Sequence, residues 1–124
     1  MANAGKQIES HRDLLVWQKS MDLAVAAYRL TVSFPSDEKF GMISQIRRSA
    51  ASVPANIAEG YGRETPGAYV QHLRVAQGSL NEFETHIELA RRVDFIQSAA
   101  SEPTITQANE IGKMLRSLIR AIDR

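Results

Sequence analysis

The stretch that decides the fold is residues 65–92, TPGAYVQHLRVAQGSLNEFETHIELARR. Its apolar residues recur at spacings of three and four, which is the periodicity of one helix face. This seam consists of Val70, Leu73, Ala76, Leu80, Phe83, Ile87 and Ala90. Thr65 followed by Pro66 is typical of a helix start, because the hydroxyl caps free N–H groups and proline suits the first turn. Gly78 interrupts the helix at a cost of about 1 kcal/mol relative to alanine, so we expect a close backbone contact there.

Three further segments show the same periodicity, and none shows the alternation of a strand. The expected helices cover residues 13–33, 39–61 and 101–123. Phe34-Pro35 ends the first of them, because proline cannot join the helical hydrogen bonding and restricts the residue before it. Ser36 or Asp37 can cap the next helix. Together with 65–92, these segments predict an all-α, single-domain, antiparallel up-down-up-down four-helix bundle over residues 13–124.

The inward faces of these helices follow from the same spacing. In the 13–33 helix the expected stripe is Leu14, Trp17, Met21, Ala24, Tyr28 and Thr31, with Val16, Leu23, Ala27 and Leu30 beside it. In the 101–123 helix, which has Pro103 in its first turn, the seam is Ile105, Ala108, Ile111, Leu115, Leu118 and Ile122.

The 39–61 helix has two apolar faces. Its large-residue seam is Ile43, Ile46, Ala50, Val53 and Ile57, beside a small-residue stripe of Ser44, Ala51, Ala55, Ala58 and Gly62. Polar residues fill the third face, and Pro54 should bend the helix. A helix with two apolar faces usually packs against neighbours on both of those faces. We therefore expect self-association, with a candidate oligomer interface formed by Ala51, Ala55, Ala58 and Gly78.

Composition excludes several classes of protein. The 124 residues hold no Cys, which excludes a disulfide scaffold, a thiolate zinc site and an iron–sulfur cluster. The net charge of +1 does not by itself favour nucleic-acid binding. Residues 1–12 lack an apolar signal region and are expected to form a flexible N-terminal segment, and no apolar run is long enough to span a membrane. We expect a cytoplasmic protein without membrane contact.

No pattern typical of catalysis or of cofactor binding is present. His72 and His86 share a helix face but lie about 21 Å apart along it, too far to hold one metal ion. The acidic residues around His86 lack Glu-x-x-His spacing, and we interpret them as a solvated face paired with Arg91 and Arg92. The segment 60–63, GYGR, lacks the remaining residues of a phosphate loop and is interpreted as a helix end. We expect no metal, no cofactor and no enzymatic activity.

Arginine supplies 11 of the 15 basic residues. Lys113, Arg116, Arg120 and Arg124 form one stripe at helical spacing. Two interpretations stay open: a solvated face that complements the negative end of the helix dipole, or a ridge that binds phosphate. Arg47 and Arg48 form a second basic pair, expected either to contact Glu59 or the acidic cluster, or to contact a ligand. Arg63 completes the set of candidate nucleic-acid or partner-binding residues.

Several ordered motifs resemble one known family. They are DLLVWQK at 13–19, FP at 34–35, QIRRS at 45–49, VPANIAEG at 53–60, GSL at 78–80 and Glu82. The chain resembles, from about Leu14 to Ile122, the four-helix-bundle family of proteins encoded in intervening sequences of bacterial ribosomal RNA genes. The resemblance implies a cytosolic homopentamer. A similar fold occurs in the accessory variability determinant of diversity-generating retroelements, a basic pentamer that binds nucleic acid and a reverse transcriptase, although the near-neutral charge here departs from that basic pattern.

Two hypotheses for the function follow from these observations. The first is a non-enzymatic oligomer that engages RNA, DNA or a nucleic-acid–protein complex through clustered arginines, with an affinity that falls with salt. The second is a structural or adaptor oligomer that docks a protein partner and binds no nucleic acid.

Overall fold

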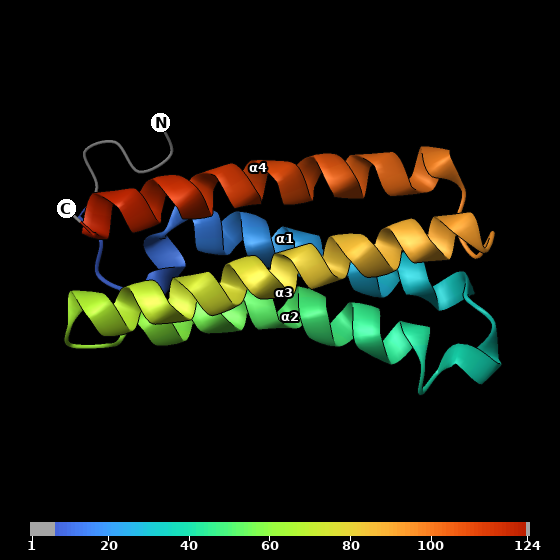
Figure 1. Ribbon diagram of the computed structural model, residues 1–124, viewed down its shortest axis with the longest axis horizontal. Coiled ribbons are helices and arrows are strands. Elements are labelled where there is room, and N and C mark those ends of the chain that lie inside the picture. Colours follow the sequence, from blue (N-terminus) through green and yellow to red (C-terminus); the bar gives the residue numbers. More distant parts are fainter. Residues whose placement is uncertain (1–6, 124) are drawn as a thin grey trace.

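The computed structural model describes residues 7–123, and the regular elements in that range are all helical. Four α-helices lie side by side along the long axis of the molecule, and successive connections lie at alternate ends (Figure 1). They are α1 (Leu15–Leu30), α2 (Met42–Tyr61), α3 (Pro66–Arg92) and α4 (Ser98–Ile122). Three short 3-10 turns accompany them: η1 (His11–Asp13), η2 (Thr31–Ser33) and η3 (Ser36–Glu38). The predicted all-α class is therefore confirmed.

The start of α3 follows its predicted capping, and the start of α2 does not. Thr65 Oγ1 accepts the backbone N–H of Ala68 at 3.1 Å, with Pro66 opening the helix. At α2, the Glu38 carboxylate accepts the N–H of Met42 at 3.1 Å, so neither Ser36 nor Asp37 is the cap. Those two residues belong to η3, and this extra turn delays the helix to Met42.

The remaining boundaries shift by a few residues. The predicted 13–33 helix is an α-helix only over 15–30, with η1 and η2 at its ends. The helix predicted from residue 101 starts at Ser98, so Pro103 lies beyond its first turn. Proline removes only the hydrogen bond to the carbonyl of Ala99, and both residues are exposed to solvent, which can hydrate that carbonyl. Of the predicted N-terminal segment 1–12, residues 1–6 lie outside the described residues, and the following turn is capped by Ser10.

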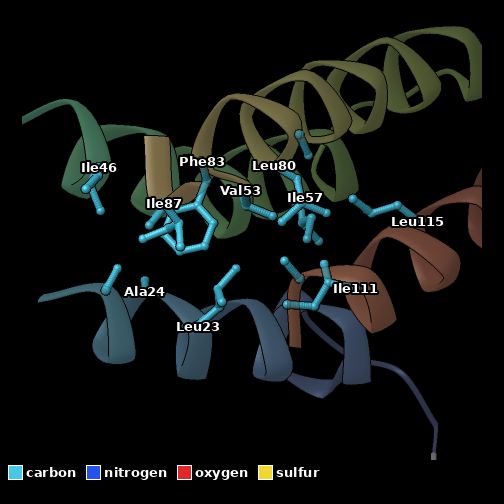
Figure 2. Packing of buried hydrophobic residues seen from close by; sticks show 14 of the residues in the cluster. Leu23, Ala24, Ile46, Val53, Ile57, Leu80, Phe83, Ile87, Ile111 and Leu115 are labelled. Carbon is cyan, nitrogen blue, oxygen red and sulfur yellow. The ribbon is translucent and has the colours of Figure 1, made fainter. Parts of the chain in front are cut away.

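Side chains from all four helices point into one core (Figure 2). The predicted seam of α3 is buried throughout, and Phe83 is the largest fully buried side chain. On α1 the predicted stripe is wrong in part, because Met21 and Tyr28 stay 39% and 48% exposed. The core residues of α1 are Val16, Ser20, Leu23, Ala24 and Ala27. Two apolar stripes lie side by side on α1, and packing between α2 and α4 selects the one centred near Leu23.

The α2 and α3 helices approach each other closely at Gly60. A Cβ atom built on Gly60 would lie 2.8 Å from His72 Cβ, so no larger residue fits there without movement. The helix α2 continues through Gly60 and Tyr61 to a C-cap at Gly62, so the segment 60–63 is the helix end that was predicted. The close contact predicted at Gly78 is wrong within the chain, because a Cβ there would meet nothing within 4 Å.

The polar third face of α2 is the face that packs on α3. Ser79 Oγ donates to Ser52 Oγ at 2.8 Å, and Asn56 Nδ2 donates to the Ser52 carbonyl at 2.9 Å. Asn56 Oδ1 faces His72 Nδ1 at 3.3 Å. An amide oxygen only accepts, so the His72 ring must carry hydrogen on Nδ1. Small and polar side chains thus close this interface.

No helix within residues 7–123 has the length and the apolar character required to cross a membrane.

Candidate functional site

A basic groove lies between α3 and α4, near the N-terminal end of α3 and the C-terminal end of α4. It encloses about 470 Å³. Its lining residues are Arg74, Gln77, Arg116, Ile119, Arg120 and Asp123. We call this surface the α3–α4 groove.

Helix geometry places these side chains together. Arg74 and Gln77 are three residues apart on α3, whereas Arg116 and Arg120 are four apart on α4, so each pair shares a helix face. Ile119 is 5% exposed and forms part of the core beneath the groove. The groove therefore has an apolar floor and arginine walls.

The α3–α4 groove carries more positive than negative charge. Arg74 lies 3.6 Å from the Asp123 carboxylate, and more than half of each side chain is exposed. Within residues 7–123, Arg116 and Arg120 form no ion pair. Three guanidinium groups thus face a single carboxylate, which leaves donors for an anion such as phosphate.

The predicted basic stripe of α4 contributes to the groove only in part. Arg116 and Arg120 line it, whereas Lys113 is exposed on the same helix but outside the lining. Arg124 lies outside the described residues. Arg74 and Gln77 of α3 were missed by the sequence reasoning. An antiparallel order places the start of α3 beside the end of α4, so a search of α3 for basic residues at that level could have found Arg74.

Arg47 is a structural residue in this fold. Its Nε donates to Thr31 Oγ1 at 2.9 Å, and a terminal nitrogen donates to the Tyr28 carbonyl at 3.3 Å. Its guanidinium also stacks 4.7 Å from the centre of the Tyr28 ring. The expected contact with Glu59 or the acidic cluster is therefore wrong for Arg47, which instead fastens α2 to the C-terminal end of α1.

Arg63 is also engaged within the chain. A terminal guanidinium nitrogen contacts Glu59 Oε2 at 2.7 Å, and Nε donates to His72 Nε2 at 3.2 Å. This side chain connects the end of α2 to the polar interface with α3. It lies apart from the α3–α4 groove, so the structure does not bring Arg63 together with Arg116 and Arg120.

A second groove lies between α2 and α3 and encloses about 430 Å³. Its lining is Gln45, Arg48, Ser49, Ala51, Ser52, Ala55, Ser79 and Glu82. We call it the α2–α3 groove. Of the residues predicted for an oligomer interface, Ala51 and Ala55 line this groove. Ala58 is half-buried outside the lining, and Gly78 is exposed on α3.

The acidic residues of α3 form the solvated cluster that was predicted. Glu88 accepts hydrogen bonds from Arg91 and Arg92, which lower the pKa of its carboxyl to about 2. Burial raises the pKa of Glu84 above its ordinary value. Across residues 7–123, no group of three or more His, Cys, Asp or Glu side chains is arranged to hold a metal ion.

Comparison with known proteins identifies a family and a related fold. A family model described as 23S rRNA-intervening sequence protein matches residues 12–117. A crystal structure from Bacteroides thetaiotaomicron, described as a protein with unknown function from the S23 ribosomal protein family, is 31% identical to this chain. The match covers 85% of this chain and 98% of that chain, with a TM-score of 0.77. No curated protein matches the chain.

Proposed function

The chain belongs to the family of 23S rRNA-intervening sequence proteins, and from that premise we propose that it is a non-enzymatic oligomer that binds the phosphate backbone of RNA. The observation that carries this proposal is the convergence of Arg74, Arg116 and Arg120 on the α3–α4 groove. Planar guanidinium groups suit bidentate contacts to phosphate oxygens, and such contacts carry no base sequence information.

The site favours backbone contacts over base recognition. Within residues 7–123 the lining of the α3–α4 groove includes no aromatic side chain on which an unpaired base could stack. Gln77 adds one polar side chain that can bond a phosphate or a 2′-hydroxyl. The groove therefore suits structured RNA, whose phosphates stand at regular intervals.

The proposal includes assembly of the chain in the cytoplasm. We propose up-down-up-down bundles arranged as a homopentamer, which is the assembly that the family resemblance implies. Repetition of the α3–α4 groove around a ring would compensate for the low net charge of one chain, because linked weak sites bind with much greater avidity than one site.

The test is fluorescence anisotropy of a labelled structured RNA against the full chain at low and near-physiological salt. We expect the logarithm of the binding constant to fall linearly with the logarithm of the salt concentration. Arg116→Glu and Arg120→Glu should each weaken binding at least about tenfold and reduce the salt slope by about 1.

The control is Lys39→Glu. Lys39 is exposed in the connection between α1 and α2, at the opposite end of the bundle from the groove (Figure 1). It should leave RNA affinity nearly unchanged. Equal losses in all three variants would show non-specific attraction and contradict the assignment to the groove. Absence of binding even at low salt would overturn RNA binding and support the adaptor hypothesis, in which the oligomer docks a protein.

A further inference from the structure

The outer side of α1 carries a continuous stripe of exposed large apolar side chains. Met21, Val25 and Tyr28 follow one another on α1 at spacings of four and three, so they share one face, and Val32 follows them in the turn η2. Their exposed fractions are 39%, 44%, 48% and 76%. The contact of Arg47 with the Tyr28 ring places this α1 stripe on the side of the bundle next to α2.

The α1 stripe is not explained by packing within one chain. The α1 core residues centre on Leu23 and Ala27, both fully buried, and face away from the stripe. Single exposed apolar residues are common, but a group of four on one helix and the turn that follows it is typical of an interaction surface.

The α2–α3 groove on the adjacent side has the opposite character. Most of its lining residues are small, so a neighbouring helix could approach closely between the longer side chains of Gln45, Arg48 and Glu82. Large side chains on one surface and a hollow lined by small ones on another are complementary in shape.

Charges beside the two surfaces are complementary as well. Asp22 is exposed at the edge of the α1 stripe, and Arg48 lines the α2–α3 groove together with Glu82, whose carboxylate lies 3.6 Å from His86 Nε2 on α3. Neither Asp22 nor Arg48 forms an ion pair with another of residues 7–123. The Asp22 carboxylate beside the α1 stripe and the Arg48 guanidinium in the α2–α3 groove favour one orientation of docking.

We infer that the α1 stripe of one copy of this chain docks in the α2–α3 groove of a second copy, with Asp22 facing Arg48 of the next chain. The inference rests on the proposed self-assembly and names the surfaces that form it. The two surfaces are different patches of the chain, so docking of one copy's stripe in the next copy's groove is a head-to-tail contact. Head-to-tail contacts that close on themselves generate rings.

The first experiment is sedimentation analysis of the full chain beside Val25→Glu, which alters the stripe, and Ala55→Glu, which alters the groove. We expect the unchanged chain to sediment as an oligomer and each variant as a monomer of about 13.8 kDa. Both sites are exposed or at the edge of the fold, and circular dichroism verifies that the helices are retained. Ser117→Glu, on an exposed part of α4 away from both surfaces, is the matched control and should leave the oligomer intact.

Mixing the two variants tests the head-to-tail contact directly. Val25→Glu keeps a working groove and Ala55→Glu keeps a working stripe, so an equimolar mixture should form a dimer with one chain of each. A mixture that stays monomeric overturns the inference.

A charge exchange tests the orientation. Asp22→Arg and Arg48→Asp should each weaken the oligomer, and the double variant should restore it. No recovery in the double variant overturns the pairing of these residues. A monomeric unchanged chain overturns both the assembly and the inference, whereas oligomers insensitive to Val25→Glu and Ala55→Glu overturn only the inference. RNA binding through the α3–α4 groove is measured separately, so its failure is distinguishable from either.

Discussion

Helix α3 has two neighbours, and its two interfaces are built differently. Toward α2, small residues and hydrogen bonds bring the backbones close, with Gly60 against His72 and Ser52 bonded to Ser79. Toward α4, the core residue Ile119 has long arginines beside it, and an open groove remains above. Both interfaces carry a surface groove, but hydrogen bonds between small polar side chains join α3 to α2, whereas the arginines Arg116 and Arg120 on the α4 side form no ion pair with another of residues 7–123.

The two interfaces differ in whether their polar groups are bonded within the chain. Polar groups at the α2–α3 interface are committed to one another, because Asn56, His72 and Arg63 form a connected set of hydrogen bonds. Arg116 and Arg120 at the α3–α4 groove form no ion pair with another of residues 7–123, so their donors stay available for a ligand.

The largest expected effect comes from the glycines of the two interfaces. Gly60→Ala places a Cβ 2.8 Å from His72 Cβ and 3.2 Å from the Tyr69 carbonyl oxygen, so the helices must separate. We expect the free energy of unfolding to fall by up to about 3 kcal/mol, as overpacking typically costs. Urea denaturation measures this loss.

Gly112→Ala is the matched change on the α3–α4 side. A Cβ there would make ordinary contacts, 3.6 Å from Leu80 Cδ2 and 3.7 Å from an Arg116 nitrogen. The greater helix propensity of alanine should therefore raise the free energy of unfolding by up to about 1 kcal/mol. If Gly60→Ala and Gly112→Ala changed the free energy of unfolding in the same direction, the proposed difference in packing between the two interfaces would be wrong.

Much of the fold could be predicted from periodicity. The α3 seam from Val70 to Ala90 is buried as expected, and its capping by Thr65 is observed. Periodicity failed where two stripes competed, as on α1, because the choice between Met21 and Leu23 depends on where α2 and α4 lie. The close contact predicted at Gly78 is wrong, and the one at Gly60 was not predicted, because only the neighbouring helix distinguishes the two glycines.

The candidate site was harder to predict. A stripe on one helix could be found, as Arg116 and Arg120 were, but Arg74 joins them only through tertiary structure. Arg47 and Arg63 share the chemistry of phosphate-binding residues, yet neighbours on α1 and α3 occupy their donors. Whether an arginine is free depends on residues distant in sequence.

A second prediction concerns the polar groups of the same two interfaces. Asn56→Ala removes hydrogen bonds to Ser52 and leaves the half-buried His72 Nδ1 without its acceptor. Unpaired polar groups of this kind cost about 1–2 kcal/mol of unfolding free energy. Chemical denaturation should show a loss in that range.

The matched removal on the open side is Arg74→Ala, which breaks only the exposed pair with Asp123. Ion pairs this exposed contribute less than about 1 kcal/mol, so stability should change little while RNA affinity falls. A loss of stability as large as that of Asn56→Ala would mean that Arg74 is structural and would count against its assignment to the binding groove.

The smallest effect is expected from ion pairs within α3 itself, where no interface is involved. The hydrogen bonds from Arg91 and Arg92 lower the pKa of Glu88 from 4.5 to about 2. A carboxyl whose pKa is lower in the folded chain than in the unfolded chain stabilises the fold above the unfolded value. That contribution is lost as the pH falls from about 4.5 to about 2, when Glu88 takes up its proton in the folded chain.

Melting temperatures of the unchanged chain and of Glu88→Gln should therefore differ slightly near neutral pH and converge toward pH 2. NMR titration of the Glu88 carboxyl, repeated in a chain carrying Arg91→Gln and Arg92→Gln, checks the cause. The pKa should return toward 4.5 when both partners are removed. An unchanged low pKa of Glu88 in that variant would mean that charges outside α3 stabilise its carboxylate. The Glu88 ion pairs could then not be treated as independent of the contacts that α3 makes with α2 and α4.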